Sequence, residues 1–175
     1  MIQVQRILGL PVLLENGKCI GKIKDLWFDE FWKLVGVILD TYARIGIRKI
    51  PKIVYWEHIL HCGEDALLIR NSSVIVTKDN KQLLRTFHTG VIRLKDMPVY
   101  TIEGQHLGEV SDVYIRPFEG TQIIGYELTD GFLADVFEGR RKLFLPDAEN
   151  MTLGEDAILV PASCERILRE TIRGK

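Results

Sequence analysis

The chain of 175 residues has few cysteines, no long apolar run and no excess of charge, and each absence excludes a class of protein. Its three cysteines are odd in number and widely scattered, unlike the disulfide framework of a small secreted domain. No uninterrupted apolar stretch approaches the roughly 20 residues that a membrane-spanning helix needs. The N-terminus also lacks the basic and apolar regions of a secretory signal. We therefore expect a cytoplasmic protein without an integral membrane segment.

The charges are balanced. Lys and Arg together number 23 against 24 for Asp and Glu, so the formal net charge is -1. No global positive field would draw such a chain onto nucleic acid, and any RNA binding would need a local basic cluster. The hydrophobic fraction of 46% is typical of a globular protein that folds.

An internal repeat is the strongest pattern in the sequence. The aligned blocks are Leu10–Phe28 with Met97–Ile115, Leu34–Leu39 with Ile123–Leu128, and Gly63–Ile69 with Gly154–Val160, at spacings of 87, 89 and 91 residues. The positions assigned to the structural repeat are Gly17, Gly21, Asp25 and Gly36 in the first copy and Gly104, Gly108, Asp112 and Gly125 in the second. Three matched blocks in one order indicate a duplicated unit.

Each copy has the residue pattern of short β-strands. Segments rich in β-branched and aromatic residues are separated by turn residues, and they are centred on Val12, Ile23, Val37, Ile53 and Leu68 in the first copy. Asn16-Gly17 is the strongest hairpin signal, and it favours a type I′ turn with positive φ at both residues. Short strands with two bare edges make an unstable open sheet. We therefore expect an all-β protein with two small barrels in tandem, each enclosing its own interior.

The alternation of apolar residues slips by one position at the same place in both copies. The slip falls at Lys24-Asp25 and again at Ser111-Asp112. A β-bulge would restore the alternation, turning Leu26 and Phe28 inward and Trp27 outward. We expect the aspartate at each bulge to accept hydrogen bonds from backbone N–H groups. A general acid or base role is the other interpretation, but the spacing indicates no Ser-His or Cys-His partner.

The most polar break in the sequence lies between the copies. We expect a first domain over residues 1–77, a linker with a helical turn or two over residues 78–89, and a second domain over residues 90–175. A short C-terminal helix is predicted from a Ser163 cap through Glu170. Its docking stripe would be Ile167, Leu168 and Ile172.

This set of motifs resembles the PRC-barrel family. The resemblance rests on a Pro-Val strand, a turn glycine, a glycine before an apolar-x-Asp strand and a later Gly-x-Asp closing strand, and it covers Ile7–Ile69 and Val91–Val160. The family includes a domain of the photosynthetic reaction-centre H subunit and the C-terminal domain of the bacterial ribosome maturation factor, which binds a small-subunit ribosomal protein. The tandem arrangement looks like small two-barrel proteins of spore-forming bacteria. The resemblance implies tandem PRC-type barrels that serve as docking surfaces in a larger assembly.

The sequence carries no recognisable catalytic or metal-binding pattern. Gly17–Lys22 has the wrong glycine spacing for a phosphate loop, and we expect a hairpin followed by a strand there. His58, His61 and Cys62 lack a fourth ligand nearby, whereas zinc sites usually show two ligand pairs. We therefore predict no catalytic residue, no metal and no cofactor, and a protein that is not an enzyme.

Two basic segments occupy comparable places in the two copies and are the candidate partner-binding residues. The first, expected in the loop after the Gly36 strand, contains Arg44, Arg48, Lys49 and Lys52; the second contains Arg140, Arg141 and Lys142, with Phe132 and Phe137 in the same loop. Arginine binds phosphate or carboxylate through paired hydrogen bonds. Solvated loop charge is the other explanation. The two phenylalanines would form an exposed patch, plug a barrel mouth or seal the two barrels together.

Two functional hypotheses follow. The first is a non-enzymatic protein-binding or adaptor module that acts in the assembly of a larger complex. The alternative is an RNA- or ribosome-associated maturation factor that uses both basic loops. Affinity for RNA would fall steeply as salt rises, whereas a mixed apolar protein interface would change less.

Overall fold

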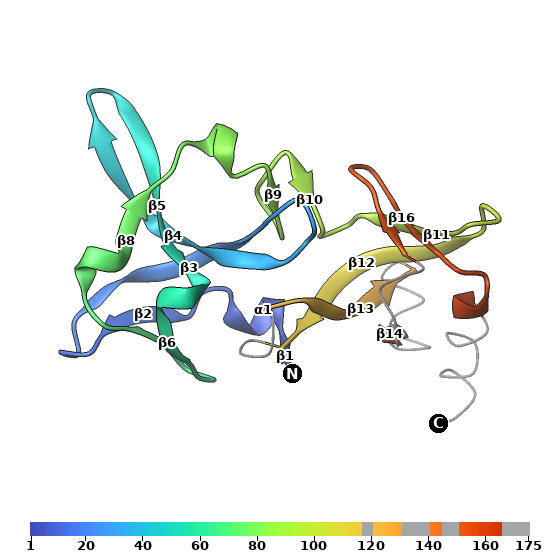
Figure 1. Ribbon diagram of the computed structural model, residues 1–175, viewed down its shortest axis with the longest axis horizontal. Helices are drawn as coiled ribbons and strands as arrows, with labels where there is room; N and C mark the ends of the chain where they lie inside the picture. The colour runs from blue at the N-terminus through green and yellow to red at the C-terminus, as the bar shows by residue number, and fades with distance from the viewer. Residues whose placement is uncertain (117–120, 131–140, 145–150, 166–175) are drawn as a thin grey trace.

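Two curled β-sheets, one for each copy of the repeat, make up most of the molecule, which the computed structural model describes over residues 1–116, 121–130, 141–144 and 151–165. The sheets lie next to each other along the long axis, the first copy in blue to green and the second in yellow to red (Figure 1). The fold is thus all-β with two tandem units, as the sequence predicted, and each unit is a curled half-barrel sheet. None of the helices in these ranges is long and apolar enough to span a membrane.

The first sheet has the strand order β6-β7-β2-β3-β4-β5-β8, with β9 attached to β3 and β10 to β9. Its strands are β2 (Pro11–Leu14), β3 (Cys19–Phe28), β4 (Leu34–Ile45), β5 (Arg48–Tyr55), β6 (Ile59–Cys62), β7 (Leu67–Ile69), β8 (Ile75–Thr77), β9 (Arg85–Thr86) and β10 (Ile92–Arg93). Short 3-10 turns are η1 (Trp56–His58), η2 (Ser72–Val74) and η3 (Asn80–Gln82).

The second sheet repeats this topology with the order β14-β13-β12-β11-β16-β15, and β1 is attached to β12. Its strands are β1 (Ile2–Gln3), β11 (Pro98–Thr101), β12 (His106–Ile115), β13 (Ile123–Thr129), β14 (Arg141–Phe144), β15 (Thr152–Leu153) and β16 (Ile158–Val160). A single helical turn, α1 (Val4–Ile7), follows β1. The parallel pair β2–β7 in one copy corresponds to β11–β16 in the other, so the copies share one topology.

The hairpin at Asn16-Gly17 is confirmed, but its predicted turn type is wrong. Gly17 has a φ of 82°, whereas Asn16 is not among the residues with positive φ. The Gly17 N–H donates to the Leu14 carbonyl oxygen at 2.8 Å, and the β2–β3 register then shifts by one residue. The loop is therefore a tight turn followed by a glycine in the left-handed conformation. Such a loop is longer than the two-residue type I′ loop that was predicted. Gly104 repeats it with a φ of 89°.

The predicted bulge is present in both long strands. The β3–β4 register shifts between Ile23 and Asp25, and the β12–β13 register shifts between Val110 and Asp112. Beyond the first bulge, Leu26 and Phe28 are buried while Trp27 stays partly exposed, as predicted.

The N-terminal segment of each copy docks on the long strand of the other copy. The first arm, residues 1–8, places β1 against β12, where Gln3 pairs with Tyr114. The second arm, residues 84–95, places β9 against β3, where Thr86 pairs with Trp27. The two copies therefore exchange their leading segments within one chain.

This exchange overturns the expectation that each copy encloses its own interior. Most of the buried apolar residues that the structure describes form one cluster, which runs from Val4 in the first arm to Cys164 near the C-terminus. Val4 and Phe87, one from each arm, are at most 1% exposed within it. Apolar arms that cross between the sheets join the two interiors into a single core.

The segment predicted as a linker carries structure of its own. Residues 78–89 include η3 and β9, and Leu83 packs on Ile38 and Ile53 outside the main core. The domain boundaries themselves remain a prediction. At the far end, residues 163–165 are helical, and the stripe of Ile167, Leu168 and Ile172 lies outside the described residues.

Candidate functional site

Asp25 sits at the bulge of β3 and binds the backbone of the second arm. Its side chain is fully buried, and Oδ1 accepts a hydrogen bond from the Leu26 N–H at 2.8 Å. Oδ2 accepts from the Thr89 N–H at 2.6 Å and from the Thr89 hydroxyl at 2.7 Å, while the His88 N–H lies 3.1 Å from both oxygens. This carboxylate is a structural acceptor, as predicted, but its donors come mainly from the other copy.

Asp112 has the same role at the bulge of β12, with a smaller set of bonds. Its Oδ1 accepts from the Gln5 N–H at 3.1 Å and from the Val113 N–H at 2.8 Å. Burial raises the pKa of this carboxyl above its ordinary value, although the two backbone hydrogen bonds act against the shift. The Gln5 side chain adds a bond of 2.8 Å to the Ser111 carbonyl oxygen, which ties the first arm to β12.

A buried polar network lies under the first arm and has no counterpart in the first copy. The Tyr114 hydroxyl donates to Glu127 at 2.9 Å, and the Gln3 amide donates to the same carboxylate oxygen at 3.0 Å. Burial, followed by the bond to Glu127, raises the pKa of Tyr114. The residue that corresponds to Glu127 in the first copy is Ile38, which Leu83 covers.

A cavity of about 750 Å³ lies where the first arm, the β6–β7 turn and the second sheet meet. Its lining includes Arg6, Glu64 and Lys142 together with Cys62 and Tyr114. Burial raises the pKa of both the Cys62 thiol and the Tyr114 hydroxyl, so both groups stay protonated near neutral pH. A protonated thiol is not an activated nucleophile.

The first basic segment lies on two paired strands, not in the loop that was predicted. Arg44 pairs with Lys49 across the β4–β5 hairpin, and Lys52 lies farther along β5 opposite β8. The hairpin projects from the upper left of the molecule in Figure 1. The strands continue past the expected loop because β4 runs as far as Ile45, which leaves Gly46 and Ile47 for the turn.

The tip of this hairpin exposes both charge and apolar surface. Ile47 is fully exposed, at 102% of its reference area, and Arg44 and Lys49 are exposed beside it. Among the described residues, none of Arg44, Lys49 and Lys52 forms an ion pair with a carboxylate. The side chain of Arg48 lies outside the described part of the structure.

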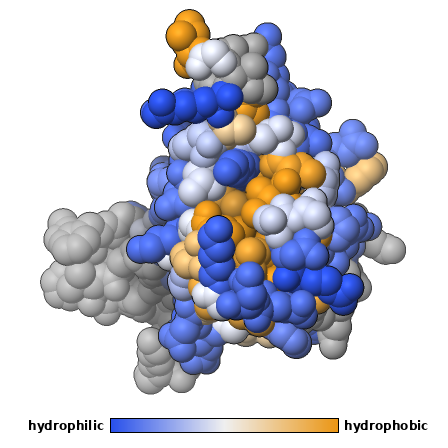
Figure 2. Space-filling view, turned by 90° about the vertical axis from the view of Figure 1, so that its left-hand side faces the viewer, coloured by the Kyte–Doolittle hydropathy of each residue, from blue (hydrophilic) through white to orange (hydrophobic). Residues whose placement is uncertain are grey.

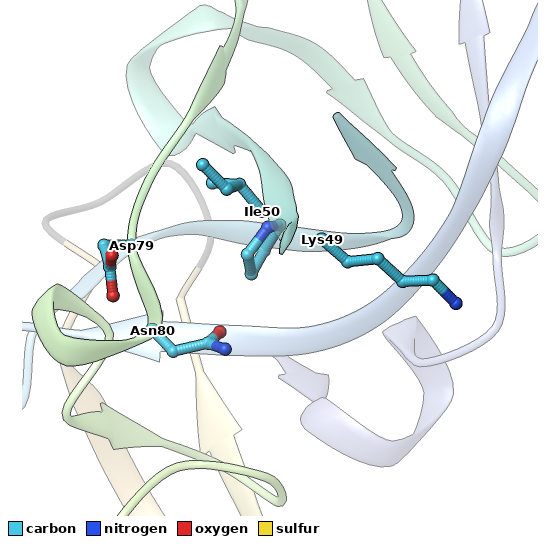
Figure 3. Close-up of a pocket in the computed structure, with 5 residues that line it drawn as sticks. Lys49, Ile50, Asp79 and Asn80 are labelled. Carbon is cyan, nitrogen blue, oxygen red and sulfur yellow. The ribbon is translucent and has the colours of Figure 1, made fainter. Parts of the chain in front are cut away.

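A shallow pocket of about 200 Å³ separates the hairpin from the chain around η3. In Figure 3, Asp79 and Asn80 lie on one side of Ile50, and Lys49 extends away from them. Lys49 is exposed, so a partner can reach its ammonium group.

The second basic segment is largely engaged within the protein. Arg141 forms an ion pair with Asp130 and donates a hydrogen bond of 2.7 Å to the Leu107 carbonyl oxygen. The ammonium nitrogen Nζ of Lys142 lies over the Tyr114 ring, 5.6 Å from the ring centre. Phe132, Phe137 and Arg140 lie outside the described residues, so their predicted role stays a prediction.

The end of the first copy that lies below the hairpin presents apolar surface. Figure 2 shows apolar side chains gathered in the middle of this end and hydrophilic ones around them. In the strands of this copy, Leu13 on β2, Leu60 on β6 and Ile75 on β8 are partly exposed, and Val76 on β8 is exposed. An apolar centre with a polar rim is the usual arrangement of a protein interface.

The candidate zinc ligands do not form a cluster. His58 and His61 are exposed, and the described ranges contain no group of three or more metal-ligating side chains. Gly17–Lys22 forms the β2–β3 turn and the start of β3, which confirms the hairpin interpretation.

Sequence reasoning missed the arms and the hairpin tip. Nothing in the sequence singled out Gln5, His88 or Thr89 as partners of the bulge aspartates. The one available signal was the burial-prone position of Asp25 and Asp112, since a buried carboxylate needs donors from some other segment. Ile47 gives no signal in the sequence, since a lone apolar residue between basic ones is common in loops.

Comparison with known proteins agrees with this architecture. A search of curated proteins found no match to the chain. The family model of the PRC-barrel domain matches the chain twice, over residues 1–77 and over residues 91–166. These matches cover most of the sequence, and each contains the main strands of one sheet. The chain is therefore a tandem member of the PRC-barrel family.

Proposed function

We propose that this protein is a non-enzymatic binding module that docks onto an acidic surface of a protein partner through the tip of the β4–β5 hairpin. The observation that carries the proposal is the combination at that tip of fully exposed Ile47 with Arg44 and Lys49, whose charges are unpaired among the described residues. An exposed apolar residue beside unpaired cations offers a partner both an apolar contact and charge complementarity, which favours an intermolecular role for this tip.

The chemistry of this surface favours a protein partner over RNA. A phosphate-binding surface needs several free cations, and the second basic segment contributes few because Arg141 is bound to Asp130 and to the Leu107 carbonyl. The hairpin also stands above an end of the molecule with apolar surface at its centre (Figure 2). A protein interface uses such mixed surface, with aromatic or aliphatic anchors inside a polar rim.

The proposed adaptor acts in the cytoplasm as part of a larger assembly. Cys19, Cys62 and Cys164 are all free thiols, and Cys19 is exposed. An exposed free thiol fits a reducing compartment, where it would stay reduced.

Charge reversal at the hairpin tests the proposal. The full chain carrying Lys49→Glu is compared with the chain carrying Arg93→Glu, which makes the same charge change at an exposed position on β10. Tagged proteins are used to capture partners from cell extract, with and without ribonuclease, and the captured species are quantified. The proposal expects a protein that survives ribonuclease, is retained by Arg93→Glu and is lost at least about tenfold with Lys49→Glu.

Two results would contradict this function. Capture that disappears with ribonuclease and falls steeply with salt would support the RNA-associated alternative instead. Equal capture by both variants would remove the hairpin from the binding surface.

A further inference from the structure

The two arm-docking sites are equivalent down to single residues. Gln3 pairs with Tyr114, and Thr86, 83 residues later, pairs with Trp27. In the same way, the Gln5 N–H donates to Asp112, and the N–H of His88, again 83 residues later, donates to Asp25. The strands that receive them are 87 residues apart. Each copy thus offers the other the same site, namely the outer end of a long strand together with a buried aspartate.

The connection between each arm and its own sheet is also equivalent. Gly9 has a φ of 81° and donates its N–H to the Ile23 carbonyl oxygen at 2.8 Å. Asp96 has a φ of 65° and donates its N–H to the Val110 carbonyl oxygen at 2.8 Å. A left-handed residue therefore turns each arm away from its own sheet and toward the other one. Asp96 adopts this conformation without being glycine, which shows that the turn is maintained at a cost in backbone strain.

From this symmetry we infer that the site formed by the bulge aspartate and the adjoining end of the long strand is an interaction surface whose partner is the arm of another PRC-barrel copy. The chain is a covalently joined pair of mutually dependent barrels. Their association does not require the chain to be continuous between the two copies.

The burial of the arms explains why one copy needs the other. Val4 and Ile7 of the first arm, and Phe87 and Leu94 of the second, are at most 1% exposed in the shared core. Without the opposite arm, Asp25 would lose the three donors of His88 and Thr89 and keep only the bond from the Leu26 N–H. A lone copy would expose the apolar side chains of this core to water and lose the bonds between the arm and the aspartate, so its fold is incomplete.

Cleavage of the folded full chain tests the inference. A protease site inserted between Lys81 and Gln82, both exposed in η3, allows the connection to be cut after folding. A denaturing gel confirms two fragments, and light scattering after gel filtration gives the native mass. The expected result is one species with the mass of the uncut chain, near 20.1 kDa. Separation of the fragments without denaturant, whether folded or not, would overturn the inference.

A pair of variants on β12 distinguishes arm docking from other contacts between the copies. In the cut protein, Asp112→Ala removes the acceptor of the Gln5 N–H, whereas Glu109→Ala removes an exposed carboxylate from the same strand. Dissociation on dilution is measured for both. Asp112→Ala is expected to weaken association roughly tenfold, and Glu109→Ala to leave it unchanged. Equal behaviour of the two variants would show that the aspartate site does not bind the arm.

Discussion

Asp25 and Asp112 occupy the same place in the two copies, and each binds the arm of the opposite copy. They differ in how their oxygens are used. Both oxygens of Asp25 accept hydrogen bonds, whereas the bonds to Asp112 from Gln5 and Val113 both go to Oδ1. The two sites therefore respond differently to the same substitution.

Asparagine substitution separates the two aspartates. Asp25→Asn replaces one of the two accepting oxygens with an NH₂ group, which cannot accept a hydrogen bond from the N–H and O–H donors that surround it. We therefore expect this substitution to lower the free energy of unfolding by about 2–3 kcal/mol. In Asp112→Asn, the amide oxygen can keep both bonds, so the expected change is below about 1 kcal/mol. Urea unfolding at pH 7 measures both. A loss at Asp112→Asn equal to or larger than that at Asp25→Asn would contradict the assigned bonding.

The pKa of Asp112 gives a pH dependence with a defined sign. Burial raises this pKa above the unfolded value of 3.8, so the folded protein holds the proton more tightly than the unfolded chain. Stability from this group is present in full below pH 3.8 and is lost as pH rises through the folded pKa. The free energy of unfolding of the natural protein, minus that of Asp112→Asn, should therefore fall as pH rises from 3.8 to the folded pKa of Asp112. Above the folded pKa this difference should stay constant. Urea unfolding of both proteins across the acid range measures the difference, and a rise with pH would show that hydrogen bonding outweighs burial.

Equivalent glycines in the two copies should tolerate alanine unequally. A Cβ at Gly36 would lie 2.5 Å from the Val54 carbonyl oxygen, which is backbone in a central strand pair. At Gly125 the nearest atom, at 2.6 Å, belongs to the ring of Phe144, which is 43% exposed and can move. We expect Gly36→Ala to cost about 2 kcal/mol or more and Gly125→Ala about half as much. Thermal unfolding compares them, and a larger loss at Gly125→Ala would reverse the argument.

Tyr126 carries a buried hydroxyl with no hydrogen-bond partner in the described structure. The side chain is 1% exposed, and burial raises the pKa of its phenol. Tyr126→Phe removes this unsatisfied group and keeps the ring, so the midpoint of thermal unfolding should rise by a few degrees, or about 1 kcal/mol. A lower midpoint would mean that the hydroxyl has a favourable interaction.

The parts of the fold that depend on local residue patterns could be predicted from the sequence. The repeat, the strands and the bulges at Asp25 and Asp112 all follow from residue periodicity, which the chain carries in each short segment. The exchange of arms could not be predicted this way, because Gln3 and Thr86 show no local preference between their own sheet and the other one. That choice depends on the direction in which Gly9 and Asp96 turn the chain, and the backbone alone reveals it.

The sequence identified residues of the candidate site but not the structure in which they lie. Arg44 and Lys49 were identified from charge, yet they were assigned to a loop because basic residues near Gly46 do not resemble strand residues. Pairing with the opposite strand overrides that weak preference. The engagement of Arg141 by Asp130 was equally hidden, since an ion pair depends on side-chain geometry.

The most direct test of the binding function is photo-crosslinking in living cells from the hairpin tip. A photoreactive amino acid replaces Ile47, and a matched chain carries it at Val91, which is 82% exposed in the second arm. The account predicts a discrete protein adduct from position 47 that survives ribonuclease and is absent from position 91. No adduct from position 47, or one that ribonuclease removes, would contradict the proposal that this hairpin binds a protein.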